Sequence, residues 1–268
     1  MIPFVKAHAC GNDFLLVEDA VAGRRHAQLA RRLCSRNTGI GADGVEFLER
    51  RAGGEFFLRL FNADGSEAEL SGNGTRCVAA WLAESEGLRE VSFGTQGGVR
   101  RCRVVEQSGA SFVIESEMGV PRVMRRTIML PDAGEIAGAM VNVGNPHFVL
   151  FIETDDFSVH GLSWQELGAQ ISLSPLFPNG TNVEFVRVLS PTEIAFRIYE
   201  RGCGPTTSSG TGTCASSAAA MMLHGTERAL TAIAEGGAQK TVWPMSDGGV
   251  MLLTGPADLI CRGEAWDL

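Results

Sequence analysis

A short Ser-Gly-x-Gly-Thr motif occurs twice in the chain, once in each half of its 268 residues. The two copies begin at Ser71 and Ser209, which are 138 positions apart (209 − 71). Ser and Thr cap helices and Gly forms turns, so a single copy would indicate only the start of a helix. Two copies, each about one domain length from the other, predict two similar domains that each contain one such helix.

The patterns around the two motifs support this division. Segments rich in β-branched and aromatic residues precede both motifs, at 56–62 and 193–200, and helical stretches follow them, at 77–86 and 215–224. We therefore predict an α+β fold in which each domain is a mixed β-sheet around a central helix.

The domain boundary is predicted from a break that contains Gly119 and Pro121. The first domain is expected at 1–118 and the second at 119–255, with a C-terminal strand at 256–268 that returns to the first domain. An active-site cleft is expected between the two.

Composition excludes several classes of protein. Lys and Arg number 23 and Asp and Glu 31, a net charge of −8, whereas a nucleic-acid binder would present a basic face. No apolar run is long enough to span a membrane, and the N-terminal segment does not read as a secretory signal, so a cytoplasmic protein is expected. Seven cysteines without a CxxC pair favour reduced thiols over disulfides.

The sequence gives no reason to expect a cofactor. Its only lysines, Lys6 and Lys240, lie outside any glycine-rich phosphate-binding context, which argues against a pyridoxal phosphate enzyme. The five histidines are scattered and have no zinc-ligand spacing. We therefore predict neither a cofactor nor a metal.

The two helix starts indicate what a shared site could bind. A helix N-terminus presents unpaired N–H groups and the positive end of a dipole, so two of them could hold a carboxylate without lysine. One residue at each helix start would flank the ligand. This geometry is required for a reaction that removes a proton from one face of a carbon and returns it to the other face. Arg201 could hold a second carboxylate and Glu200 an ammonium group.

These residues also carry a family resemblance that runs from residue 1 to about 265. The motifs, in order, are His8-Ala-Cys-Gly-Asn-Asp-Phe14, Thr38-Gly-Ile-Gly-Ala-Asp43, Asn62-Ala-Asp-Gly-Ser-Glu67, Gly72-Asn-Gly-Thr-Arg-Cys77, Gly144-Asn-Pro-His147, the turn at Asn182, Glu200-Arg-Gly202, Gly210-Thr-Gly-Thr-Cys214 and Thr254-Gly-Pro-Ala257. The chain resembles the diaminopimelate epimerase family. The resemblance implies cofactor-independent, two-base inversion of LL-diaminopimelate to the meso form, which serves lysine or cell-wall synthesis.

The resemblance also implies individual site residues. Substrate contacts are expected at Asn12, Asn62, Gly72, Asn73, Asn145, Asn182, Glu200, Arg201, Gly210 and Thr211. His147 and Glu200 would adjust the protonation of the two catalytic groups. Asn is also common in turns for backbone reasons, so Asn12, Asn62 or Asn182 taken singly is better explained as a turn residue. The expected partner is a small amino-acid substrate, and the oligomeric state is left open, with a homodimer as the working expectation.

One departure from the family bears on catalysis. The family has a catalytic cysteine before each GxG turn, where this chain has Ser71 and Ser209. A thiol titrates near pH 8.5, whereas a serine hydroxyl does not ionise in that range without a strong adjacent base. Three interpretations stay open: a substituted form of an active epimerase, a serine variant with another isomerase or dehydratase chemistry, and a protein that binds an amino acid without converting it.

Overall fold

The computed structural model describes residues 1–131, 133–244 and 249–266, and the chain divides into two compact units. Unit 1 comprises Met1–Glu117 and Thr254–Leu268, and unit 2 comprises Met118–Leu253. The predicted boundaries at 118/119 and 255/256 lie within two residues of these divisions. The last two residues of the predicted C-terminal strand fall outside the described part.

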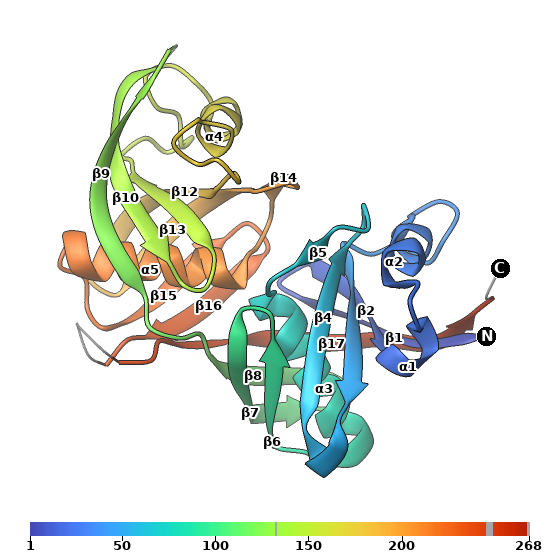
Figure 1. Ribbon diagram of the computed structural model, residues 1–268. Helices are drawn as coiled ribbons and strands as arrows, with labels where there is room; N and C mark the ends of the chain where they lie inside the picture. Colours follow the sequence, from blue (N-terminus) through green and yellow to red (C-terminus); the bar gives the residue numbers. More distant parts are fainter. Residues whose placement is uncertain (132, 245–248, 267–268) are drawn as a thin grey trace. The chain divides into compact units, whose positions relative to one another are not determined.

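Unit 1 is a ring of β-strands around one helix (Figure 1). Its strands are β1 (Ile2–Ala9), β2 (Asn12–Glu18), β3 (Gly44–Arg50), β4 (Phe56–Asn62), β5 (Glu67–Ala68), β6 (Glu90–Thr95), β7 (Gly98–Ser108), β8 (Ser111–Glu117) and β17 (Leu252–Ala265). The pairings run β1–β2–β3–β4–β6–β7–β8–β17 and return to β1, so the described strands close on themselves. The pairs β2–β3 and β4–β6 are parallel and the other registered pairs are antiparallel, which makes the sheet mixed.

The helix α3 (Gly72–Glu86) forms the centre of unit 1. It contacts six of the ring strands, and Cys77, Val78 and Leu82 are fully buried in a core with inward side chains of those strands. Gly87 ends the helix in a left-handed conformation; its N–H donates to the Ala83 carbonyl, and the N–H of Leu88 donates to the Leu82 carbonyl. The helix is thus apolar on nearly all sides because it is covered on nearly all sides.

Unit 2 repeats this arrangement around the helix α5 (Gly210–Leu223). Its strands are β9 (Arg122–Leu130), β10 (Gly134–Asn142), β11 (Pro146–Phe151), β12 (Asn182–Ser190), β13 (Glu193–Glu200), β14 (Gly204–Thr206), β15 (Ala229–Ala234) and β16 (Gly237–Val242). The pairs β11–β12 and β13–β15 are parallel and the rest are antiparallel, as in unit 1. Element by element, β10 to β16 correspond to β1 to β7. This confirms the predicted fold class of two similar domains.

A second core lies on the outer face of each sheet. In unit 1 the helix α2 (His26–Cys34) packs on β3 and β4, with the short α1 (Asp19–Ala22) before it. In unit 2 the helix α4 (Trp164–Ser172) packs on β12 and β13. Residues on β3 and β12 therefore alternate between the outer core and the central helix, with period two.

Several predicted elements differ from the observed ones. Both central helices begin at the first glycine of the motif, five residues before the predicted helical stretches. The strand β3 was not predicted, and β9 begins directly after the break predicted at Gly119 and Pro121. Glycine-rich first turns and short strands beside turns carry weak local signals, which explains these errors.

None of the described helices is long and apolar enough to cross a membrane.

Candidate active site

The serines of the two motifs are the N-caps of the two central helices. Ser71 Oγ accepts the N–H of Gly74 at 2.9 Å, and Ser209 Oγ accepts the N–H of Gly212 at 3.2 Å. Both serines have the extended backbone of an N-cap residue. The two units therefore present the same group at the same place, at the N-terminus of a buried helix.

The second glycine of each motif makes room for a buried carboxylate. Glu46 on β3 and Glu184 on β12 both point towards the first turn of their central helix. A Cβ at Gly74 would collide with Glu46 Oε1, and a Cβ at Gly212 would lie 3.1 Å from Glu184 Oε1. A side chain at these two positions would displace the acid or the helix, so the close approach requires glycine.

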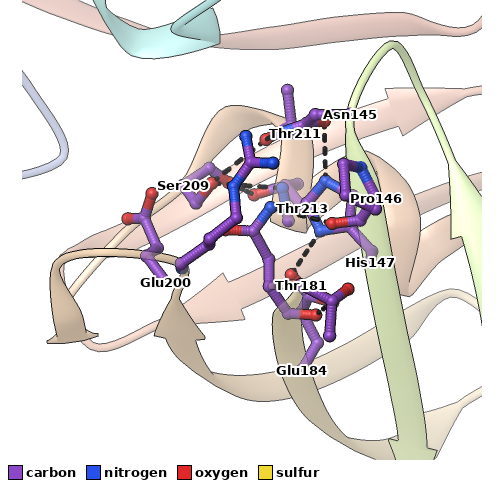
Figure 2. A network of polar contacts seen from close by, with 12 residues as sticks. Asn145, Pro146, His147, Thr181, Glu184, Glu200, Ser209, Thr211 and Thr213 are labelled. Atoms are coloured by element: carbon purple, nitrogen blue, oxygen red, sulfur yellow. Dashed lines mark hydrogen bonds and ion pairs between the residues drawn. The ribbon is translucent and has the colours of Figure 1, made fainter. Parts of the chain in front are cut away.

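In unit 2 a hydrogen-bonded chain leads from Glu184 to the cap (Figure 2). His147 Nδ1 lies 2.6 Å from Glu184 Oε1, and His147 Nε2 lies 2.9 Å from Asn145 Oδ1. Asn145 Nδ2 donates to Thr211 Oγ1 at 3.3 Å, and that hydroxyl lies 3.4 Å from Ser209 Oγ. Three side chains thus connect the fully buried Glu184 to Ser209 at the helix start.

Burial raises the pKa of Glu184, while the charge of His147 and its hydrogen bond lower it again. Both side chains are completely shielded from solvent. A buried carboxylate is tolerated only with such a partner, because an unpaired one costs several kcal/mol. His147 is therefore held in one orientation, with its second nitrogen on Asn145.

The loop after β13 places Glu200 and Arg201. The backbone N–H of Arg201 donates to Asn182 Oδ1 at 3.0 Å, and Asn182 Nδ2 donates to the Pro146 carbonyl at 2.9 Å. Thr206 donates to Glu200 Oε1 at 2.5 Å. Asn182 thus ties the start of β11 to the Arg201 loop, which is a positioning role within the same neighbourhood as His147.

In unit 1 the corresponding polar residues form another pattern. Asn73 Nδ2 donates to Asn12 Oδ1 at 3.1 Å, and Asn12 Nδ2 donates to Asp43 Oδ2 at 2.7 Å. The fully buried Arg76 donates to Asn73 Oδ1 at 2.7 Å and to the Gly72 carbonyl at 3.1 Å. Here a buried cation holds the first turn through hydrogen bonds.

An ion-pair cluster extends this network to the surface. Asp13 pairs with Lys6 at 3.0 Å and with Arg36 at 2.9 Å, and Arg36 also pairs with Asp43 at 2.8 Å. Burial alone would raise the pKa of Asp13, but the hydrogen bonds and charges of Arg36 and Lys6 lower it below the usual value. Lys6, one of the two lysines, therefore has a structural partner.

The structure brings the predicted residues together in two groups. The group at the start of α3 consists of Ser71, Gly72, Asn73 and Asn12. The group at the start of α5 consists of Asn145, His147, Asn182, Ser209, Gly210 and Thr211. Asn62 instead shows the turn role: its side-chain amide donates to Ser66 Oγ at 3.0 Å and its N–H to the Ser66 carbonyl at 2.9 Å.

Sequence reasoning overlooked Glu46 and Glu184. Each is the third residue of its strand, and a charged residue at a position that faces the core is the signal that could have revealed it. The strand β3 was not predicted, so the inward position of Glu46 could not be recognised. Within the described residues, no three His, Cys, Asp or Glu side chains are grouped as metal ligands.

Comparison with known proteins gives one consistent result. The diaminopimelate epimerase family matches residues 4–124 and 139–260. A diaminopimelate epimerase of Pelotomaculum thermopropionicum is 36% identical over 97% of this chain and 98% of that protein. One of a Synechocystis strain is 35% identical over 98% and 99%, respectively.

Solved structures share the fold. A predicted epimerase of Pseudomonas aeruginosa superposes with a TM-score of 0.76 at 14% identity and covers 99% of both chains. A probable proline racemase of Agrobacterium radiobacter superposes with a TM-score of 0.75 at 17% identity, over 100% of this chain and 93% of the other. Fold and relatives together define the class as that of amino-acid racemases and epimerases. Within that class, the chain belongs to the diaminopimelate epimerase family.

Proposed function

We propose that this protein is a diaminopimelate epimerase-type isomerase, which inverts one α-carbon of LL-diaminopimelate to give the meso form without a cofactor. The observation that supports this most is the equivalence of Ser71 and Ser209 as N-caps of the two central helices. A two-base inversion needs one group on each face of the carbon. Positions 71 and 209 are the acid/base positions in this proposal.

Substrate binding follows from the surroundings of the two caps. The first-turn N–H groups that have no intrahelical acceptor would hold the carboxylate next to the reacting carbon and stabilise the charge that develops there. Arg201 would bind the distal carboxylate through its guanidinium, on a loop held by Asn182. Asn12, Asn73, Asn145 and Thr211 would orient the amino and carboxylate groups, since they already form hydrogen-bonded pairs at the caps.

The serines make the chain, as it stands, a poor base catalyst. Among the described residues, the hydrogen-bond partners of Ser71 and Ser209 are backbone N–H groups and the Thr211 hydroxyl, and none is a carboxylate or an imidazole. Without a strong adjacent base, a serine alkoxide does not form near neutral pH. We therefore propose that the all-serine chain binds the substrate and converts it very slowly.

Solvent deuterium exchange at the α-carbon tests this function. The chain and its Ser71→Cys/Ser209→Cys variant would be incubated with LL-diaminopimelate in D₂O and followed by NMR and chiral chromatography. Exchange with inversion by the variant supports the proposal. Loss of water would indicate a dehydratase, and binding without exchange in both proteins would indicate an amino-acid-binding protein.

Two further expectations from the resemblance stay predictions. They are a homodimer, which sedimentation analysis would test, and a cytoplasmic location in a lysine-producing cell, which fractionation would test.

A further inference from the structure

Glu46 is a buried carboxyl group with an unusual environment. It lies on β3 opposite Leu16 of β2 and Leu60 of β4, and its side chain is 1% exposed. Its Oε1 has no hydrogen-bond partner among the described residues. The oxygen points at Gly74 in the first turn of α3. The N–H of Gly74 donates to the Ser71 hydroxyl.

The second unit shows what is missing around Glu46. Glu46 pairs with Leu60, two residues before the end of β4, and Glu184 pairs with Ile198, two residues before the end of β13. The two acids are therefore equivalent. His147 is the partner of Glu184, and register places Phe14 at the equivalent position of unit 1.

Among the described residues, no cation is hydrogen-bonded to Glu46 Oε1 in place of the imidazole. The side chains that β2 and β4 direct into this core are apolar, among them Phe14, Leu16 and Leu60. On α3, Arg76 donates to the Gly72 carbonyl and to Asn73.

The remaining ionisable groups of this core lie around Cys77. Burial first, and then the charges of Glu46, Asp258 of β17 and Cys10, raise the pKa of the Cys77 thiol, while Arg76 lowers it. Cys77 is therefore neutral at every pH considered below. Burial without compensation also raises the pKa of Glu46, to about 8. The carboxyl group is accordingly protonated at neutral pH, and it becomes an anion in mildly alkaline solution.

We propose that Glu46 is a positioning residue whose protonation state controls anion binding at the start of α3. Neutral Glu46 supports the first turn of α3 through its contact with Gly74. The N–H groups of that turn then stay available to a substrate carboxylate. Ionised Glu46 places a second negative charge against the same turn, where it opposes that carboxylate. This inference rests on the proposed function, because the anion is taken to be a carboxylate of diaminopimelate.

The expected size follows from linkage. If a bound carboxylate raises the pKa of Glu46 by about one unit, binding weakens about fivefold between pH 7 and pH 9 and approaches a tenfold loss above that. The amino groups of the ligand also titrate in this range, so the informative quantity is the difference between two proteins measured with the same ligand.

Calorimetric titration with LL-diaminopimelate from pH 6.5 to 9.5 tests the proposal. The native chain should lose affinity about fivefold more by pH 9 than Glu46→Gln, which carries an isosteric neutral amide. Cys77→Ala, which removes the adjacent ionisable group, should behave like the native chain. Identical pH dependence in the native chain and Glu46→Gln would overturn the proposal.

An infrared readout needs no ligand. The native chain should show the carbonyl band of a protonated, shielded carboxylic acid at pH 7, and the band should disappear as the pH rises through about 8. Absence of that band at pH 7 would overturn the proposal even if Glu46→Gln did not fold; Glu46→Leu then serves as the assignment control. Failure to bind diaminopimelate at any pH, with the band present, would reject the proposed function and leave the buried neutral acid in place.

Discussion

Units 1 and 2 share their strand order, their parallel and antiparallel pairings and a capped central helix, yet they differ in the charges beside that helix. In unit 2 an acid is paired with an imidazole, Glu184 with His147. In unit 1 the equivalent acid, Glu46, has an apolar neighbour, and a buried arginine fixes the helix start.

The difference shows that the backbone determines where a carboxyl group lies, whereas one facing residue determines whether that group has an ionisable partner. Such asymmetry suits an inversion reaction, because one face must begin as a base and the other as an acid. The expected experiments test how far the two units are equivalent.

The largest effect is expected from changing both caps together. Ser71→Cys with Ser209→Cys should raise epimerisation by several orders of magnitude, since each acid/base group contributes about 10²–10⁴-fold. Either single change should allow α-hydrogen exchange with little inversion, because the two groups act on one proton path. Rapid turnover by the all-serine chain, measured as conversion of LL to meso ligand, would show that another group transfers the proton.

Removal of the His147 imidazole should leave Glu184 without its partner, as Glu46 is in unit 1, and should strongly lower the stability of the protein. His147→Ala should lower the free energy of unfolding by about 3–5 kcal/mol, because Glu184 is left buried without its partner. Urea denaturation at pH 8 measures this. The double variant His147→Ala/Glu184→Gln keeps the cavity and removes the charge, so it should recover part of the loss. Equal losses in both would mean that packing, and not charge, explains the effect.

Glu46→Gln should stabilise the protein in alkaline solution only. The folded-state pKa of Glu46 is raised to about 8 from an ordinary 4.5, so the native chain loses stability as pH rises between those values. At pH 9 the variant should be more stable on the order of 5 kcal/mol, and near pH 4.5 the gain should vanish. Thermal unfolding at both pH values checks the sign; a constant difference would contradict it.

Arg201→Met should show how much the contact with the distal carboxylate contributes to binding, apart from the contacts at the helix N-termini. Loss of this charge-assisted contact should weaken the binding of diaminopimelate by about 1.5–3 kcal/mol, with little change in the binding of a monocarboxylate amino acid. Competition calorimetry with both ligands provides the comparison. Equal losses would remove Arg201 from the proposed site.

The smallest effect concerns the outer helices. Ser163 caps α4 in a reciprocal capping box with Glu166, whereas Arg25 at the start of α2 makes no side-chain cap bond. Ser163→Ala should therefore cost about 1 kcal/mol in urea unfolding, and Arg25→Ala should cost less. An equal loss from Arg25→Ala would contradict this and show that the two outer helices begin in energetically similar ways.

The repeated motif predicted the two units because N-cap chemistry is local: a hydroxyl, two glycines and a helix lie within six residues of one another. The same locality predicted Ser71 and Ser209 as helix starts. The network behind them depends on strand register. Whether Glu184 faces the central helix or the outer core is decided by pairing with other strands, and a shift of one residue would reverse it.

The family motifs named Asn12, Asn73, Asn145 and His147, and the structure places all four near the caps. Their roles toward a substrate stay predictions. The motifs did not identify Glu46, whose environment depends on Phe14, a residue that is unremarkable by itself. Asn62 illustrates the opposite case, in which a motif residue has a sufficient local explanation in the turn at Ser66.

The last strand, β17, leaves unit 2 at Leu253 and pairs with β1 from Ile2 onward, across more than 250 positions. During synthesis, therefore, the earlier half of the chain waits for its closing strand until the later half has emerged. Unit 2 can complete its pairings first, while β1 and β8 keep open edges that invite wrong partners. Folding order should thus be the reverse of translation order.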